Sequence, residues 1–189
     1  MPWEIPDNGR PCTSGSASVA RSSSLPTPTP TLSPEKEISL FIYDDAAEPG
    51  WDIQVNSGQG EIDLSSKSVV HNGRFAIEAS MDSWASFAMW TKPLNTSQFL
   101  YLEFYINGGS QGGQRINVLA FSEGVVLTNL ETSNYTGARI LPPGKWLMVR
   151  IPVEDLDPNN DPVTGFVIEN HSDDPAPTFY VDDIRFVGA

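Results

Sequence analysis

The chain has 189 residues and a formal net charge of −13, from 24 acidic and 11 basic side chains. This excess of negative charge repels phosphate backbones and anionic lipid, so we expect neither nucleic acid nor a membrane surface as a partner. No apolar run approaches the roughly 20 residues that span a bilayer, and the first residues lack the basic start and apolar stretch of a signal peptide. Hydrophobic residues make up 39% of the chain, which is enough for one compact domain and a tail.

Residues 1–36 are rich in Ser, Pro, Thr and Gly and end in the stretch SSSLPTPTPTLSPEKE. Alternating Thr and Pro favour an extended, solvated chain, so we predict a disordered tail and linker there and one folded domain at residues 37–189. Linkers of this composition commonly join the modules of secreted proteins, and an untethered tail is the alternative. The only cysteine, Cys12, lies in this tail, so neither an internal disulfide nor a cysteine-based zinc site is expected.

From Ile38 onward the chain is a series of short segments in which apolar and polar residues alternate. Segment 74–80, RFAIEAS, places Phe75 and Ile77 on one face, and segment 99–106, FLYLEFYI, also has two distinct faces. Further candidate strands are 39–43, 85–91, 114–122, 125–130, 145–152, 165–170 and 179–187, separated by turn-forming stretches such as NGGSQGG and DPNNDP. Short strands without a long amphipathic helix predict an all-β fold, a two-sheet β-sandwich of the jelly-roll type. The stretch VEDLD is compatible with one helical turn.

An acidic pair stands at each end of the predicted domain: Asp44 and Asp45 follow the first strand, and Asp182 and Asp183 interrupt the last. In a sandwich whose first and last strands are neighbours, these carboxylates would meet, and without a cation their repulsion would raise their pKa values. Calcium takes carboxylate and carbonyl oxygens as ligands, whereas we expect the His and Cys ligands typical of zinc and redox metals to be missing nearby. The alternative is that Asp44 and Asp45 cap the following turn while Asp183 lies on a solvated face.

Several motifs follow one another along the predicted domain: IYDDAAEPGW, SVVHNGRFAIEA, LYLEFYINGG, KWLMVRIPVEDL and TFYVDDIRFV. Their order resembles the jelly-roll carbohydrate-binding modules attached to secreted bacterial glycoside hydrolases, and the resemblance covers nearly all of residues 38–187. It implies a galactose-binding-domain-like sandwich, secretion, a covalently linked catalytic domain and a structural calcium ion. The calcium ligands that it implies are Asp44 or Asp45, the backbone from Asn72 to Arg74, and Asp182 or Asp183.

Tryptophans are the strongest candidates for a sugar-binding surface. Pyranose rings stack on flat aromatic side chains while neighbouring polar groups bind the hydroxyls. In ASFAMWT, Phe87 and Met89 are predicted to face the core. Trp90 is therefore predicted to lie on the outer face, where its ring could stack on a sugar. Trp84, just before this strand, is predicted to line the same groove. Trp51, in the turn after the first strand, is a further candidate, although we favour a packing role at one end of the sandwich for it.

Polar partners for a sugar follow from the same alternation. Arg115 and Asn117 lie opposite an apolar stripe, and Glu169 turns outward from its strand. A guanidinium, an amide and a carboxylate could bind sugar hydroxyls, and an ordinary solvated surface is the alternative.

Two other groups of aromatic residues are weaker candidates. Tyr101, Glu103 and Tyr105 form a strip on one predicted strand. Trp146 stands between equally apolar neighbours and is predicted to pack, while Trp3 belongs to the tail.

The sequence predicts a noncatalytic carbohydrate-binding module that targets an appended glycoside hydrolase to a polysaccharide, a β-glucan or another β-linked plant glycan. The alternatives are a protein-interaction or adhesion sandwich, or a small glycosidase domain. Glu78, Glu103 and Glu169 lie on separate predicted strands, and no serine stands in a G-x-S-x-G nucleophile motif. We therefore expect no enzymatic activity, and we expect an extracellular monomer.

Overall fold

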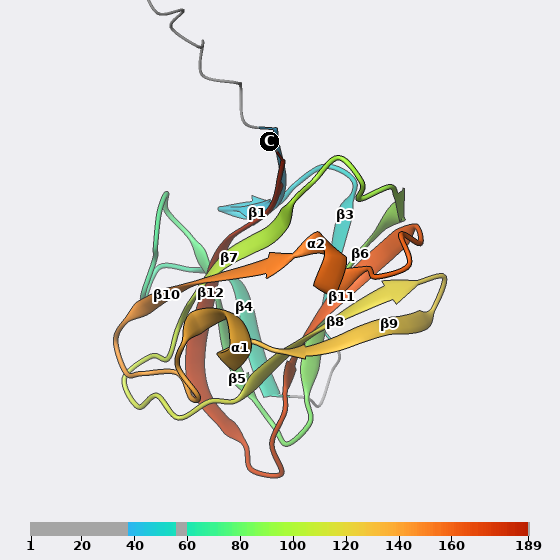
Figure 1. The fold of residues 1–189 in the computed structure, drawn as a ribbon. Helices are drawn as coiled ribbons and strands as arrows, with labels where there is room; N and C mark the ends of the chain where they lie inside the picture. The colour runs from blue at the N-terminus through green and yellow to red at the C-terminus, as the bar shows by residue number, and fades with distance from the viewer. Residues whose placement is uncertain (1–37, 56–59, 189) are drawn as a thin grey trace, which may run out of the picture. The chain divides into compact units, whose positions relative to one another are not determined.

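Two antiparallel β-sheets, packed face to face, make up the fold of residues 38–55 and 60–188, which the computed structural model describes (Figure 1). The seven-stranded sheet consists of β1 (Ser39–Asp44), β2 (Ala46–Ala47), β4 (Gly60–Ser66), β5 (Ala76–Met81), β7 (Tyr101–Asn107), β10 (Trp146–Pro152) and β12 (Ala176–Val187). The five-stranded sheet has the order β3 (Trp51–Val55), β6 (Ser86–Leu94), β11 (Val163–Asn170), β8 (Ile116–Ser122) and β9 (Val125–Glu131). The predicted β-sandwich is confirmed.

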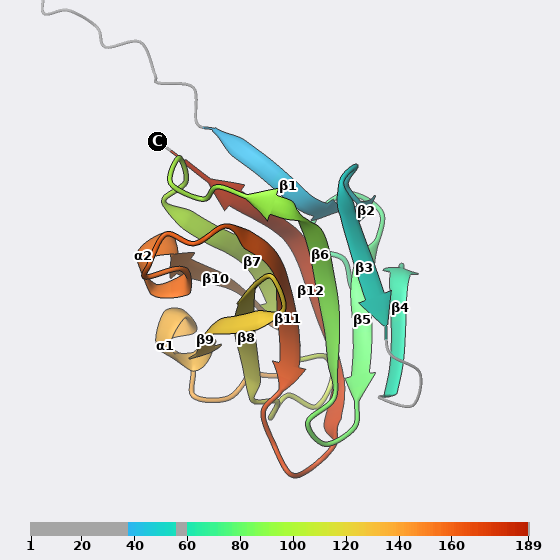
Figure 2. The ribbon, with the colours of Figure 1, turned by 90° about the vertical axis from the view of Figure 1, so that its right-hand side faces the viewer.

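The longest strand, β12, is the spine of the seven-stranded sheet. Along one side it pairs with β7, and along the other it pairs first with β5 and then with β1 (Figure 2). The first and last strands are therefore neighbours, with Ser39 opposite Val187. The ladder between β12 and β7 shifts register between Asp182 and Arg185, and Asp183 has a φ of 52°. This irregularity turns the acidic pair away from a regular strand geometry.

The core lies between the two sheets. In β7, Leu102, Phe104 and Ile106 are buried, and in β11 Phe166 and Ile168 are buried against them. Because side chains alternate along a strand, Tyr101, Glu103 and Tyr105 of β7 and Val167 and Glu169 of β11 lie on the outer faces. The alternation in the sequence assigns these residues correctly. It fails just before β7, where Phe99 is buried and Leu100 is 51% exposed.

Strands β3 and β4 are not predicted by the alternation. Most of their residues are exposed or half-buried, and they lie at the edges of the two sheets, so their apolar signal is weak. The helices are single turns, α1 (Ser133–Thr136) and α2 (Val153–Leu156), and the second coincides with the turn expected at VEDLD.

The predicted tail and linker at residues 1–36, with Trp3 and Cys12, lies outside the described residues. Among the residues that are described, no helix is both long and apolar enough to cross a membrane.

Candidate functional site

The outer face of the five-stranded sheet carries most of the residues that were predicted to bind a ligand. Strand register sets the side chains of β6, β11 and β8 in rows across this face. The rows are Trp90, Gly165 and Phe121; then Ala88, Val167 and Leu119; then Ser86, Glu169 and Asn117. We call these residues the five-stranded face. Trp90, Asn117 and Glu169 share it, as the sequence predicts.

One end of the five-stranded face is aromatic. The rings of Trp90 and Phe121 are partly exposed and meet edge to face, with centroids 5.4 Å apart and planes at 70°. Val126, opposite Phe121 on β9, is 48% exposed and extends the apolar surface. This end offers the ring and C–H contacts on which sugar stacking depends.

The other end of the five-stranded face is polar. Glu169 lies opposite Asn117 on β8, and its Oε1 is 3.3 Å from Nδ1 of His171. The Asn117 side chain donates a hydrogen bond to Oδ1 of Asn129 at 2.6 Å. His171 is not among the residues that the sequence predicts to bind a ligand; it follows directly after β11, two residues from Glu169.

Trp84 stands at the corner beyond the polar end. Its side chain is 48% exposed, its Nε1 donates a hydrogen bond to Asp173 at 3.0 Å, and its ring meets His171 edge on at 4.8 Å. With Arg115 and residues 171–174 it lines a shallow hollow of about 370 Å³. The structure thus brings Trp84 and Arg115 together, at the end of the face opposite to Trp90.

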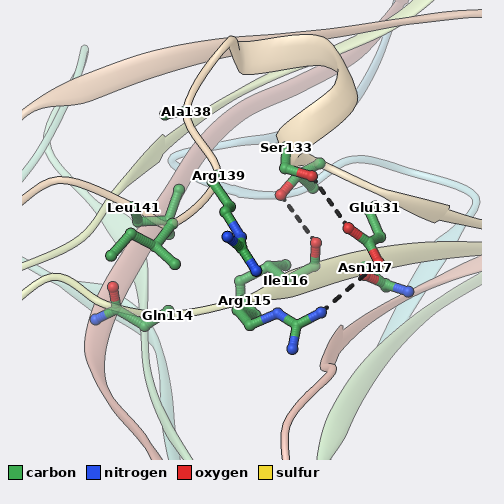
Figure 3. A pocket seen from close by; sticks show the side chains of 11 residues that line it. Gln114, Arg115, Ile116, Asn117, Glu131, Ser133, Ala138, Arg139 and Leu141 are labelled. Atoms are coloured by element: carbon green, nitrogen blue, oxygen red, sulfur yellow. Dashed lines mark hydrogen bonds and ion pairs between the residues drawn. The ribbon is translucent and has the colours of Figure 1, made fainter.

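Arg115 reaches across the edge of the sheet toward β9. Its guanidinium is 3.7 Å from Glu131, and its side chain is 52% exposed (Figure 3). The cavity beside it holds only about 10 Å³, room for roughly one water molecule. Arg115 is therefore available from the hollow beside Trp84 and not from the narrow cavity behind it.

Trp51 does not belong to the predicted sugar-binding surface. It is the first residue of β3, it is only 9% exposed, and its ring stacks on Phe166 in the core at 6.0 Å. The alternation WDIQV sends Trp51 and Ile53 inward, so the indole packs under the sheet, in the role favoured from the sequence.

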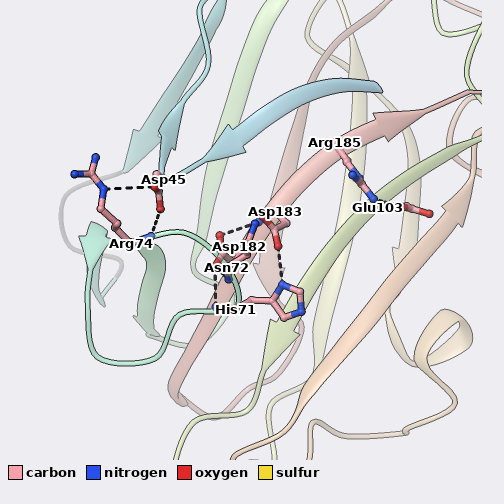
Figure 4. Close-up of polar contacts among 8 residues, drawn as sticks. All are labelled: Asp45, His71, Asn72, Arg74, Glu103, Asp182, Asp183 and Arg185. Carbon is pink, nitrogen blue, oxygen red and sulfur yellow. Dashed lines mark hydrogen bonds and ion pairs between the residues drawn. The ribbon is translucent and has the colours of Figure 1, made fainter. Parts of the chain in front are cut away.

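The strip formed by Tyr101, Glu103 and Tyr105 lies on the outer face of the seven-stranded sheet. Its one charged side chain, Glu103, already has arginine partners. Glu103 is 1% exposed and accepts hydrogen bonds from Arg150 and Arg185 (Figure 4 shows the pair with Arg185). Arg150 also lies over the ring of Tyr101, at 4.8 Å from its centroid. The strip is therefore an ion-pair network more than a stacking platform.

His71 covers the other ring of this strip. It stacks on Tyr105 at 3.6 Å between centroids, and its edge meets Trp146 at 5.3 Å. Trp146 is half-buried on the same outer face, outside the core, so its predicted packing role stays a prediction.

The two acidic pairs meet where β1 and β12 are neighbours, but their oxygens have separate partners. Oδ1 of Asp45 accepts the backbone N–H groups of Arg74 and Phe75, at 2.5 and 2.8 Å, and these bonds hold the pKa of Asp45 below its ordinary value. The charge that acts most strongly on Asp44 is that of Asp183. Burial, followed by the charges of Asp183 and Asp45, raises the pKa of Asp44.

Asp182 is fully buried and accepts backbone N–H groups at both oxygens. The donors are His71 at 2.9 Å, Asn72 at 3.3 Å and Asp183 at 2.9 Å (Figure 4). Burial raises the pKa of Asp182 in spite of these bonds. Oδ2 of Asp183 lies 2.6 Å from Nδ1 of His71. The expectation that no histidine lies near the acidic pairs is therefore wrong, because the turn that contains His71 lies beside β12 in the fold.

This donor set does not fit one ion held by all four carboxylates together. Asp45 and Asp182 face amide N–H groups, and the backbone of Asn72 is a donor to Asp182. Within residues 38–55 and 60–188, no group of three or more His, Cys, Asp or Glu side chains is arranged to hold a metal ion. Asp44 and Asp183 are the carboxylates left for a cation that also uses backbone carbonyls.

No protein-family model matches the chain, and no curated protein sequence does. Solved structures match it over most of the chain. A family 30 carbohydrate-binding module has 21% identity and a TM-score of 0.53, over 80% of this chain and 99% of that one. A family 11 module from Clostridium thermocellum, in complex with a β-1,3-1,4-mixed-linked tetrasaccharide, has 15% identity and a TM-score of 0.52, over 80% and 96%.

A variant of a family 29 module in complex with mannohexaose also matches, with 10% identity and a TM-score of 0.52, over 81% of this chain and 93% of that one. At such identities the likeness concerns the fold and not the binding residues. The resemblance in the motif order is confirmed at this level: the chain has the jelly-roll fold of these carbohydrate-binding modules.

Proposed function

We propose that this chain is a noncatalytic carbohydrate-binding module whose site is the five-stranded face with the corner of Trp84 and Arg115. The observation that carries the proposal is the arrangement of this face, with Trp90 at one end, Trp84 beyond the other and Glu169 between them. Asn117, in the same row as Glu169, is only 3% exposed and is not counted as a ligand contact. From Trp90 to Ser86 is about 13 Å at the usual rise along a strand. An extended glycan chain can therefore meet aromatic and polar groups in turn.

The ligand that we propose is a β-glucan or another β-linked plant glycan. Support comes from the neighbouring folds, since the complexes of the family 11 and family 29 modules contain a mixed-linked tetrasaccharide and mannohexaose. The face is shallow and open, so a ligand gains stacking and a few hydrogen bonds without full burial. We expect affinities of about micromolar to millimolar.

The three glutamates considered as catalytic candidates support a binding role over a glycosidase. Glu103 is held between two arginines, and Glu78 accepts a hydrogen bond from Ser66 at 2.5 Å. Glu169 lies on the opposite sheet. These glutamates are thus kept apart, whereas glycoside hydrolysis needs an acid and a second carboxylate on either side of one bond.

A linked catalytic domain, secretion and a monomeric state complete the proposal. They are supported by the composition of residues 1–36, which is typical of linkers between secreted modules, and by the fold.

Native gels that contain soluble polysaccharides, run beside a reducing-sugar release assay, test the function. Retardation by a β-glucan without release of sugar is the expected result. Release would indicate an enzyme. If neither is seen across a broad glycan panel and isothermal titration gives no heat, the carbohydrate proposal is wrong and a protein-interaction sandwich becomes the better hypothesis.

We further propose that a structural calcium ion is bound where β1 and β12 meet, by Asp44, Asp183 and backbone carbonyls. The support is electrostatic: burial and the charge of Asp183 raise the pKa of Asp44, so the deprotonated pair is unfavourable without a cation. Calcium accepts six to eight oxygen ligands of mixed kind.

A further inference from the structure

A glycine in the middle of β11 lies directly beneath the indole of Trp90. We propose that Gly165 is a positioning residue, which sets the orientation in which Trp90 meets a glycan. The inference rests on the proposed function of the five-stranded face. It concerns a residue that touches no sugar and acts only through the ring above it.

The φ angle gives no reason for glycine at this position, although the ladder with β6 shifts register between Val163 and Gly165. Gly165 is not among the glycines with positive φ, and glycine weakens the interior of a strand because it has no side chain to pack. The space above it does give a reason. A Cβ atom at residue 165 would overlap Cε3 of Trp90, and it would lie 2.7 Å from Cζ3 of Trp90 and 2.9 Å from the Met89 carbonyl oxygen.

The missing side chain also lets two rings meet. Trp90 on β6 and Phe121 on β8 both lie opposite Gly165, on the strands that flank β11. Strands two apart in a sheet are separated by about 10 Å. The ring centroids are nevertheless only 5.4 Å apart, so the rings lean toward each other over the glycine.

The lean of the indole decides which part of it is exposed to a ligand. Sugar stacking depends on the orientation of the ring face, and Phe121 holds that orientation from one side. A methyl group at residue 165 would lift the indole from the sheet and separate it from Phe121. Because the indole is the movable end of a side chain, we expect the ring to turn, while a small local shift of β6 relieves the contact with the Met89 carbonyl oxygen.

The substitution Gly165→Ala tests this directly. The probes are the β-1,3-1,4-mixed-linked tetrasaccharide, cellohexaose and mannohexaose, titrated calorimetrically. Affinity should fall by about tenfold at a temperature where the melting curve shows that the variant is still folded. Met148→Ala is the control from outside the site, because Met148 is 42% exposed on the outer face of the seven-stranded sheet. It should change affinity by less than about twofold.

A double-mutant cycle separates an effect through Trp90 from a general one. In the Trp90→Ala background, Gly165→Ala should cost no further affinity. The near-ultraviolet circular dichroism of the free protein should change on Gly165→Ala in the parent and stay the same in the Trp90→Ala background. If Gly165→Ala prevents folding, the added Trp90→Ala change should restore it, since the clash is gone.

Each failure points to a different error. If Trp90→Ala loses affinity and Gly165→Ala does not, the positioning role is wrong and the proposed function stands. An equal loss in both backgrounds, or failure of Trp90→Ala to restore folding, also overturns the role of Gly165. If the parent binds none of the probes, the proposed ligand class fails, and an unchanged circular dichroism spectrum would then refute the geometry as well.

Discussion

The neighbours of each tryptophan determine whether its ring is available to a ligand. Trp51 is buried against Phe166, whereas Trp84 is 48% exposed and is held at its edge by a hydrogen bond to Asp173. Trp90 is partly exposed beside Phe121. Two indoles are thus anchored and still present surface to solvent, which lowers the entropy lost when a ligand binds.

We expect Trp90→Ala and Trp84→Ala each to weaken glycan binding by roughly 1–3 kcal/mol, with little change in melting temperature, because these rings contribute to the complex more than to the core. Isothermal titration and thermal unfolding of the same samples measure the two effects.

Trp51→Ala is the control from the core and should lower the free energy of unfolding by about 3–5 kcal/mol, as large buried aromatics do. Full affinity of the Trp90→Ala variant would mean that the ligand binds elsewhere than on the five-stranded face.

Local alternation predicts only part of the site. It assigns Trp90, Asn117 and Glu169 to one outer face because each stands in a strand with a clear apolar stripe. The roles of His71 and Gly165 depend on strands that are distant in sequence: the partners of His71 are on β7 and β12, and the ring above Gly165 belongs to β6. No spacing within one segment carries that information.

At the scale of elements, β1 and β12 are neighbouring strands, and their pairing brings the two acidic pairs together. Their proximity is predictable from a sandwich whose first and last strands pair, and the structure confirms that pairing. The individual hydrogen bonds are not predictable, because they depend on the bulge in β12 and on the turn that contains His71 and Asn72. The edge strand β3 could have been found, since WDIQV alternates, but a strand this short is easily taken for a turn.

The calcium proposal predicts that a chelator lowers the melting temperature by several degrees, that calcium restores it, and that magnesium does so poorly. Thermal unfolding in each buffer, together with metal analysis of the purified protein, checks this. A curve that does not move in a protein without bound metal would refute the proposal.

The direction in which Asp44→Asn changes the melting temperature, with and without calcium, shows whether Asp44 is a calcium ligand. The pKa of Asp44 is raised above 3.8 in the folded state, so the folded state holds the proton more tightly, and without a cation stability falls as the pH rises through this range. Without calcium, Asp44→Asn should therefore raise the melting temperature at neutral pH. In calcium it should lower the melting temperature relative to the parent, because a ligand is lost. A rise in both buffers would show that Asp44 is only a source of repulsion.

The whole molecule is a strongly acidic sandwich with two different outer faces. The face of the seven-stranded sheet is occupied by the network around Glu103 and by His71 on Tyr105. The five-stranded face carries the exposed rings and the polar row. With a formal charge of −13, the molecule repels anions within about one screening length, which is about 30 Å at 0.01 M salt.

This charge predicts which glycans are rejected. Binding of a neutral β-glucan should be nearly independent of salt between about 0.01 and 1 M, over which the screening length falls from about 30 Å to about 3 Å. An acidic polysaccharide such as polygalacturonate should bind more weakly, least of all at low salt. Affinity electrophoresis or titration at the two salt concentrations checks this, and tight binding of the acidic polymer at low salt would contradict it.

The position of β12 as the spine has a consequence for the route by which the sandwich assembles. This strand is last among the described elements, yet β1, β5 and β7 all pair with it, and the N–H of Gly188 donates to the carbonyl of Ile38 at 2.7 Å. Nearly every contact that closes the seven-stranded sheet thus joins residues far apart along the chain, an arrangement that slows folding. During synthesis the seven-stranded sheet therefore cannot close until β12 has left the ribosome.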